Sequence, residues 1–367
     1  MISSAVRPTE RHPLPDILRG LAILGILWVN MQDFAGYDEW RQHGADRVAQ
    51  VVIDVLFNGR FISIFAMLFG AGVAALLARH DLALLLRRLL VLLALGSLHA
   101  VLLWHGDIIA SYALLGLLLL VPLTLRLSSG RLTVLAAALG AYWLLARSLE
   151  ALAVPALHRW TTVQRTADLQ HYLPLVQQRA SSYLSTFTDN LLYNAPWLLC
   201  LLLLGAAAQQ AGVLQRPAEH RPLLRRLAWG GVALGVPLGL LLAWLNSLST
   251  AQAGYWAVPV RMSGGLALGL GYVGLVGLAV AAGQAGGLRR FAAAGQLALT
   301  HYLTQSLLMT TLFYPYGLGL YARLGALPCL LIALALGAVQ LWISAPLLRR
   351  FRRGPMEALL RRVVYGR

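Results

Sequence analysis

The sequence contains ten mostly apolar runs of 18 to 25 residues, and this repetition restricts the possible folds more than any other feature. A helix needs about 20 apolar residues to cross a hydrocarbon core that is roughly 30 Å thick. We therefore predict an all-α, polytopic membrane helix bundle of about ten transmembrane helices. The composition agrees, because 59% of the residues are hydrophobic and only 12% are charged, unlike a typical soluble domain. The predicted spans cover 17–34, 61–79, 86–104, 108–125, 132–154, 191–212, 227–246, 258–282, 296–314 and 326–348.

The distribution of arginine predicts the orientation of the bundle. The chain has no lysine, and its 30 arginines cluster where apolar runs end, as at Arg87-Arg88 and Arg289-Arg290. With a cytoplasmic N-terminus, 21 arginines fall in inner segments and 8 in outer segments. This positive-inside bias predicts a multi-pass protein of the bacterial inner (cytoplasmic) membrane with both termini cytoplasmic. The chain lacks a basic stripe on a polar domain, so we expect membrane lipids and no nucleic acid as partners.

The predicted domain organisation is simple. Residues 1–348 form a transmembrane helical domain with a larger periplasmic loop at 155–190, and residues 349–367 form a basic, amphipathic cytoplasmic tail on the inner leaflet. Gly231, Gly235 and Gly239 form a small-xxx-small ridge that favours close helix packing. No histidine pair has the His-Glu-x-x-His spacing, so no metal site is expected.

Polar residues inside the apolar runs are costly and mark candidate sites. Asp16 and Arg19 lie three residues apart at the start of the first run. They form either a topology anchor with a local ion pair, or a gate or anion site on the cytoplasmic side. Asn30, His99 and His301 each follow an arginine by 11 residues. That spacing corresponds to about 16 Å of helix, which is close to the middle of the membrane.

Two further groups have structural alternatives. Arg147 and Glu150 are spaced for mutual neutralisation. Asp107, in the short turn after His105, either caps the next helix or lines an outward-facing mouth. The chain contains neither a Gly-x-Ser-x-Gly elbow nor a Walker sequence, which excludes the serine hydrolases and ATPases that use them.

Several blocks of the sequence form a recognisable pattern, and they cover 16–30, 68–72, 104–108, 298–306 and 351–357, together with His99, Tyr112 and Gln305. Their order and spacing resemble the YeiB-type family of bacterial inner-membrane proteins. At the corresponding positions that family usually has Asn in place of His301 and Lys in place of Arg60.

The first block is also similar to a wider group of transmembrane acyltransferases that includes the heparan-α-glucosaminide N-acetyltransferases. Those enzymes share the spacing of Asp16, Arg19 and Asn30, and they transfer an acetyl group from cytoplasmic acetyl-CoA across the membrane. Their catalytic histidine follows that asparagine in the next loop. Here Arg41 stands at the corresponding spacing, and His43 lies two residues further on.

The leading hypothesis is a membrane acyltransferase that uses acyl-CoA, with acetyl-CoA as the first candidate, and a small-molecule, glycan or lipid acceptor. His99 would be the base, Asn30 would donate to the oxyanion, and Asp107 would lie at the acceptor mouth, with His43 as the reserve base. Phosphate binding would fall to Arg19 with the inner arginines, and the cofactor-binding set is Asp16, Arg19 and Arg88. His301, Gln305 and Arg60 complete the polar core. A transporter or exporter of a small molecule or lipid, and a non-enzymatic assembly or sensor protein, are the alternatives, and a homo-oligomer is compatible with each.

Overall fold

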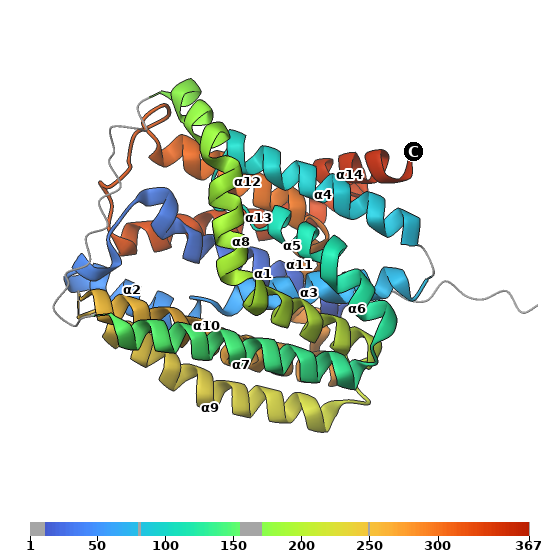
Figure 1. The fold of residues 1–367 in the computed structure, drawn as a ribbon. Helices are drawn as coiled ribbons and strands as arrows, with labels where there is room; N and C mark the ends of the chain where they lie inside the picture. The colour runs from blue at the N-terminus through green and yellow to red at the C-terminus, as the bar shows by residue number, and fades with distance from the viewer. Residues whose placement is uncertain (1–11, 80–81, 155–170, 249, 367) are drawn as a thin grey trace, which may run out of the picture.

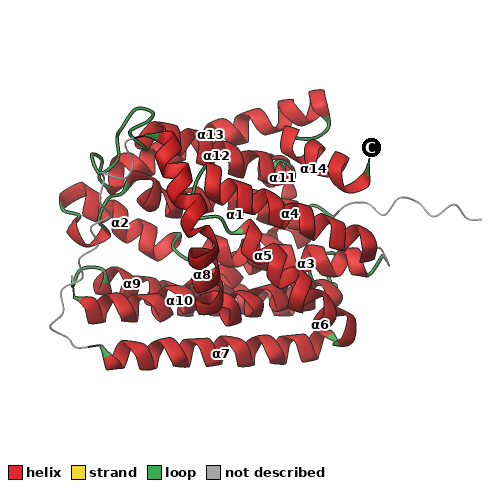
Figure 2. Ribbon diagram, turned by 45° about the horizontal axis from the view of Figure 1, so that its top comes forward, coloured by secondary structure: helices red, strands yellow, loops and turns green. Residues whose placement is uncertain are grey.

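A computed structural model describes residues 12–79, 82–154, 171–248 and 250–366. Throughout these ranges the regular structure is helical, with no β-strand (Figure 2). The principal helices are α1 (Leu14–Ala35), α2 (Gly44–Leu56), α3 (Arg60–Leu77), α4 (Leu82–Leu102), α5 (Ile109–Leu115), α6 (Val121–Arg126), α7 (Ser129–Ala153), α8 (Tyr172–Gln210), α9 (Arg221–Leu245), α10 (Ala251–Ala281), α11 (Arg289–Gln296), α12 (Ala298–Phe313), α13 (Ala326–Phe351) and α14 (Pro355–Tyr365).

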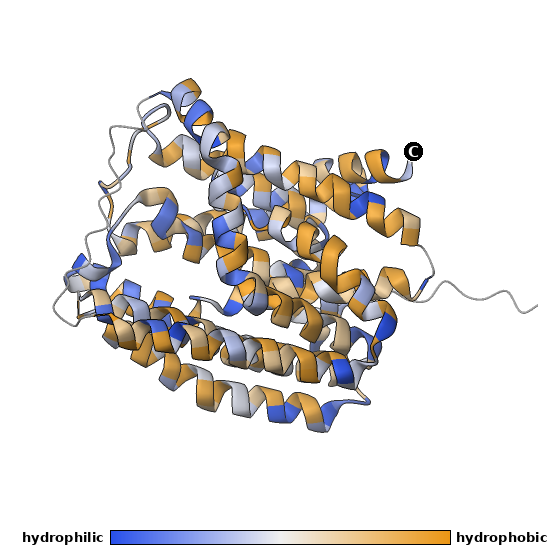
Figure 3. Cartoon of the chain, in the orientation of Figure 1, coloured by the Kyte–Doolittle hydropathy of each residue, from blue (hydrophilic) through white to orange (hydrophobic). Residues whose placement is uncertain are grey.

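The long helices confirm the predicted fold class. Within the described residues, nine helical segments are long and apolar enough to cross a membrane, including Gly44–Leu77, which joins α2 and α3, and Ile109–Arg126, which joins α5 and α6. The remaining predicted span, 296–314, forms α12, which has only 16 residues. Along most of the long helices hydrophobic residues dominate, and hydrophilic residues gather near many of the helix ends (Figure 3). The chain is therefore a multi-pass membrane protein.

Two segments outside the predicted spans are helical. Only part of the loop predicted at 155–190 can be compared with the structure, because 155–170 lie outside the described residues. Arg7 and Arg11, which were counted among the inner arginines, also lie outside them. From Tyr172 onward the segment belongs to α8, a helix of 39 residues. Residues 44–56, which lie between the predicted spans 17–34 and 61–79, form the amphipathic helix α2, which buries Ala49, Gln50, Ile53 and Asp54 on one face. Polarity placed both segments outside the predicted spans, although residues such as Gln, Arg and Ala also favour helices.

The helices form two groups around α1 and α3. In Figure 1, α7, α9 and α10 lie together on one side, and α4, α12, α13 and α14 lie on the other. Glycines allow the closest approaches, since a methyl group at Gly231 of α9 would collide with the backbone of α10, as the small-residue ridge predicted. The predicted ion pair between Arg147 Nη1 and Glu150 Oε2 is confirmed at 2.7 Å. This packing leaves the facing surfaces of α1, α3, α4, α12 and α14 to form the candidate site.

Candidate functional site

A buried cluster of His99, Asp107 and Tyr302 joins α4, the α4–α5 turn and α12. His99 Nδ1 lies 2.9 Å from Asp107 Oδ2, and the Tyr302 hydroxyl donates to the same oxygen at 3.2 Å. The His99 and Tyr302 rings are 4.9 Å apart between centroids. The side chains of His99 and Asp107 are only 1% and 2% exposed. The imidazole of α4 and the hydroxyl of α12 thus meet at one carboxylate oxygen of the α4–α5 turn.

The local chain explains why Asp107 occupies this position. Helix α4 ends at Leu102, and a short turn leads to α5. Asp107 Oδ1 accepts from the Ala110 backbone N–H at 2.9 Å, which confirms the predicted cap of the next helix. A side chain at Gly96 would collide with Asp107 and Ala110, so this glycine allows α4 and α5 to approach. The alternative in which Asp107 lines an open outer mouth is wrong, because its side chain is buried.

The second ring nitrogen of His99, Nε2, is a candidate proton acceptor. His99 Nε2 is buried and has no hydrogen-bond partner among the described residues. When Nδ1–H donates to Asp107, the neutral tautomer carries its free lone pair on Nε2. A buried imidazole in this arrangement can accept a proton from a group that comes within hydrogen-bond distance.

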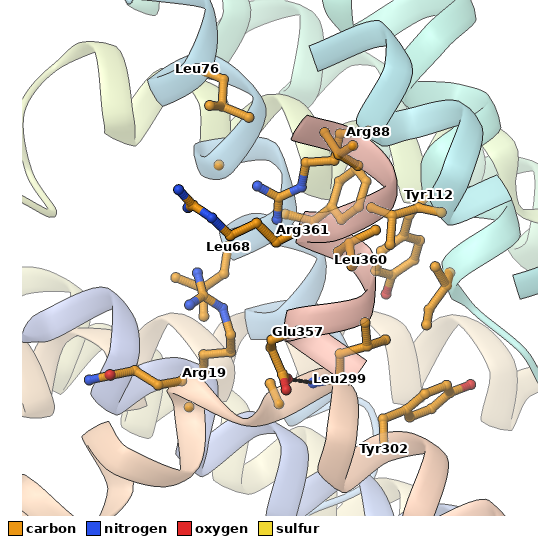
Figure 4. A pocket seen from close by; sticks show the side chains of 18 of the residues that line it. Arg19, Leu68, Leu76, Arg88, Tyr112, Leu299, Tyr302, Glu357, Leu360 and Arg361 are labelled. Atoms are coloured by element: carbon orange, nitrogen blue, oxygen red, sulfur yellow. Dashed lines mark hydrogen bonds between the residues drawn. The ribbon is translucent and has the colours of Figure 1, made fainter. Parts of the chain in front are cut away.

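A cavity of about 480 Å³ lies on one side of this cluster. Its walls are mainly apolar side chains of α3 and α4, and Tyr112 and Tyr302 line it as well (Figure 4). Tyr302 both lines the cavity and donates to Asp107, so it connects the cavity to His99. The five cationic lining residues are Arg19, Arg88, Arg352, Arg353 and Arg361.

The arginines and the buried cluster lie at different heights along the same helix. On α4, Arg88 precedes Leu92 by four residues, and Leu92 precedes His99 by seven. With a rise of 1.5 Å per residue, about 16 Å of helix separates Arg88 from His99. The cavity therefore combines a strongly positive end, an apolar middle and a tyrosine-lined end adjacent to the His99–Asp107 pair.

Helix α14 forms one wall of this cavity. Glu357 accepts hydrogen bonds from the backbone N–H groups of Leu299 and Thr300, at 2.8 and 3.0 Å, and so caps α12 from outside that helix. The tail was predicted to lie on the inner leaflet, and that position stays a prediction. Within the tail, α14 packs against α4 and α12, with Val364 buried. Its arginines thus join those of α1 and α4 around one opening, and the guanidinium groups of Arg19, Arg88 and Arg361 extend toward it in Figure 4.

The predicted site residues fall into several places. Arg19 and Arg88 line the cavity, and Asp16 forms the predicted ion pair with Arg19 at 2.9 Å. No hydrogen bond joins Asn30 to His99 in the described chain, and Tyr302 completes the cluster instead. The part of α1 that follows Asn30 is still close to the α4–α5 turn, because the ring centroids of Phe34 and Trp104 are 4.3 Å apart.

Two predicted residues lie in other polar groups. His301 Nε2 is 2.8 Å from Ser344 Oγ, and the Gln305 amide donates to Gln340 Oε1 at 2.8 Å. These contacts join α12 to α13, because Ser344 and Gln340 belong to α13. His301 and Tyr302 are successive residues and point to different sides of α12. His301 therefore packs against α13 and is not part of the His99 cluster.

Arg60 and His43 lie outside the cavity. Arg60 is fully buried at the start of α3 and donates to the carbonyl oxygens of Asn58 and Gly235. Asp54, also fully buried, accepts from the amides of Gln50, Asn58 and Asn246. His43 is exposed and immediately precedes α2, and among the described residues no hydrogen bond or ion pair joins it to the His99 cluster.

Sequence reasoning missed Tyr302, Tyr112, Glu357 and Arg361 as members of one site. A tyrosine in an apolar run raises little suspicion, because its ring is compatible with ordinary packing. Both Tyr302 and Glu357 nevertheless lie in the blocks that resemble the YeiB-type family, which was the available signal. Among the described residues no group of three or more His, Cys, Asp or Glu side chains could hold a metal ion.

The fold and the cluster define a polytopic helical membrane protein with a buried His–Asp–Tyr group beside an arginine-lined cavity. The family described as "Protein of unknown function (DUF418)" matches residues 208–367. The chain is 31% identical to the uncharacterized protein YxaH of Bacillus subtilis, over 99% of this chain and 97% of YxaH. It is 30% identical to the uncharacterized protein YeiB of Escherichia coli, over 96% of each chain. The chain therefore belongs to the YeiB-type membrane protein family. No solved structure matches it.

Proposed function

We propose that this protein is an integral-membrane acyltransferase of the bacterial inner membrane. It takes an acyl group from cytoplasmic acyl-CoA, acetyl-CoA in the first instance, and transfers it to an acceptor at or across the membrane. One observation carries the proposal: a single cavity has arginines at one end and, at the other, a tyrosine bonded to the buried His99–Asp107 pair.

The shape of the cavity suits the chemistry of the donor. Acyl-CoA has phosphates at one end, a thioester at the other and a long, mostly uncharged arm between them. Arg19, Arg88 and Arg361 would bind the phosphates through charge-assisted hydrogen bonds. The apolar walls would hold the arm, so that the thioester reaches the end lined by Tyr112 and Tyr302.

The buried cluster supplies the proton chemistry of transfer. His99 Nε2 takes the proton from the acceptor hydroxyl or amine, and the acceptor atom bonds to the thioester carbonyl carbon. The carbon–sulfur bond then breaks, and the departing thiolate takes up the proton. Asp107 holds the imidazole in the required tautomer and stabilises its charged form. The Tyr302 hydroxyl already donates to Asp107, whereas the Tyr112 hydroxyl donates to the Ile62 carbonyl only at the long distance of 3.5 Å. Tyr112 is therefore the nearest candidate to donate to the thioester carbonyl oxygen as negative charge develops.

A glycine in the cavity wall provides a direct test. Gly72 of α3 lines the cavity, and a methyl group at this position would meet no atom within 4 Å. Gly72→Leu therefore places bulk in the cavity without a backbone collision, and it replaces a poor helix former with a good one. Gly230→Leu is the matched control, because Gly230 also has open space and lies on the exposed surface of α9.

The experiment measures binding of acetyl-CoA to purified protein in nanodiscs. We expect wild type and Gly230→Leu to bind it and Gly72→Leu to lose at least tenfold in affinity, with the melting temperature unchanged or raised. Equal binding by Gly72→Leu would show that acetyl-CoA does not use this cavity. The absence of binding to wild type would overturn the proposed function.

A further inference from the structure

The arginines of the cavity come from two parts of the chain. Arg19 and Arg88 belong to α1 and α4, which are candidate membrane spans, whereas Arg361 belongs to the 11-residue helix α14. Glu357 is the only carboxylate among the described lining residues, and its two oxygens are bonded to Leu299 and Thr300 of α12. Arg19 pairs with Asp16 at 2.9 Å, so Arg88 and the arginines that follow α13 supply most of the positive charge that faces a ligand with several phosphate groups.

A tyrosine accompanies Arg361. Tyr365 also lines the cavity, and the Arg361 guanidinium carbon lies 4.7 Å from the centre of its ring. The ring is 41% exposed, so one face can accept a flat partner. Aromatic side chains beside arginine are a common platform for nucleobases.

We propose that α14 recognises the nucleotide end of the donor, with Arg361 binding a ribose 3′-phosphate and Tyr365 stacking on the base. This inference rests on the proposed function and identifies the donor as a nucleotide-linked thioester. A phospholipid or an acyl chain on a protein-bound pantetheine arm lacks both groups.

Each group of CoA has a counterpart among the residues that line the cavity. CoA combines a thiol, a pantetheine arm, a diphosphate and an adenosine with a 3′-phosphate. The cavity presents Tyr302, apolar walls, Arg19 and Arg88, and Arg361 with Tyr365 of α14. A phosphomonoester adds about −1.5 to −2 charge to the two charges of the diphosphate. Arginines from two parts of the chain therefore correspond to two phosphate groups on one ligand.

The test compares CoA with 3′-dephospho-CoA, which differ only in the phosphate assigned to Arg361. Binding is measured at low ionic strength, because salt screens exposed charges. We expect wild type to bind CoA about tenfold more tightly than 3′-dephospho-CoA, as one charge-assisted contact implies. Arg361→Gln should weaken CoA binding about tenfold and leave 3′-dephospho-CoA binding unchanged, so that the two ligands become equal.

Two further variants separate the contributions of α14. Arg362→Gln removes the neighbouring exposed charge, which does not line the cavity, and should preserve the preference for CoA. Tyr365→Leu should weaken both ligands alike, by about tenfold, because stacking does not involve the phosphate. Equal binding of both ligands to wild type, or an equal loss in Arg362→Gln and Arg361→Gln, would overturn this inference while CoA binding itself still supports the proposed function. If neither ligand binds, the proposed function fails as well.

Discussion

Glu357 is the residue whose removal most directly tests how α14 is held. It accepts from the backbone N–H groups of Leu299 and Thr300 and from the Thr300 hydroxyl at 2.5 Å. These groups lie in the first turn of α12, where Leu297 at the N-cap position provides no side-chain acceptor. The carboxylate of α14 therefore does for α12 what a capping residue normally does from within the chain.

The cost of losing this contact follows from ordinary capping energies. Replacing an N-cap acceptor by alanine costs about 0.5–2 kcal/mol. Removing a negative charge from a helix N-terminus costs about 0.3–1 kcal/mol more. Together, Glu357→Ala should weaken the docking of α14 by about 1–3 kcal/mol, which corresponds to roughly a 5- to 150-fold increase in the undocked population. A helix of 11 residues is marginal on its own, so an undocked α14 should unfold locally.

Amide hydrogen exchange of residues 355–365 measures this population. We expect exchange in Glu357→Ala to rise by the factor above, while the core of α3 keeps its protection. Glu219→Ala is the control, because Glu219 pairs with Arg216 at 3.2 Å with both side chains about 60% exposed, and such pairs contribute little. Unchanged protection of 355–365 in Glu357→Ala would refute the reasoning that this carboxylate fastens α14 to α12.

Three other predictions follow from the site and the topology. His99→Gln should keep acetyl-CoA affinity and lower acyl transfer by at least about 100-fold, as loss of a general base implies, and a variant that transfers normally would remove His99 from the mechanism. Burial, together with nearby Asp54, raises the pKa of Glu39 to about 7, so its protonated form favours the folded state. Thermal stability should therefore decline as pH rises from about 5 to 8 and should do so less in Glu39→Gln; identical pH profiles would contradict this. Cysteines introduced at Gln178 and Ala218, both exposed, should react with impermeant reagents from opposite sides of the membrane, and labelling from the same side would refute the predicted topology.

Interactions local in sequence were predictable from the sequence. The Arg147–Glu150 pair and the cap provided by Asp107 depend on residues three apart, so helical spacing alone brings them together. The fold class was equally accessible, because the length of an apolar run directly reflects membrane thickness.

The assembled site depends on distant contacts that no local pattern encodes. Tyr302 bonds to Asp107 across 195 positions, and Glu357 bonds to Leu299 across 58. Depth alone grouped Asn30, His99 and His301, but a helix also has a rotational orientation. His301 faces α13 and bonds to Ser344, whereas the next residue, Tyr302, faces His99. The sequence therefore predicted how far along its helix each polar residue lies, whereas only the structure showed toward which neighbouring helix its side chain points.

The central claim is that the cavity delivers an acyl group to the His99 cluster. The most direct measurement follows radiolabelled acetyl groups from acetyl-CoA in proteoliposomes that contain the purified protein and bacterial membrane extract as the source of acceptor. Our account predicts that label leaves CoA for a new product in wild type, that His99→Gln binds acetyl-CoA without forming this product, and that Gly72→Leu does neither. Label that remains on CoA in wild type, at the rate seen with empty liposomes, would contradict it.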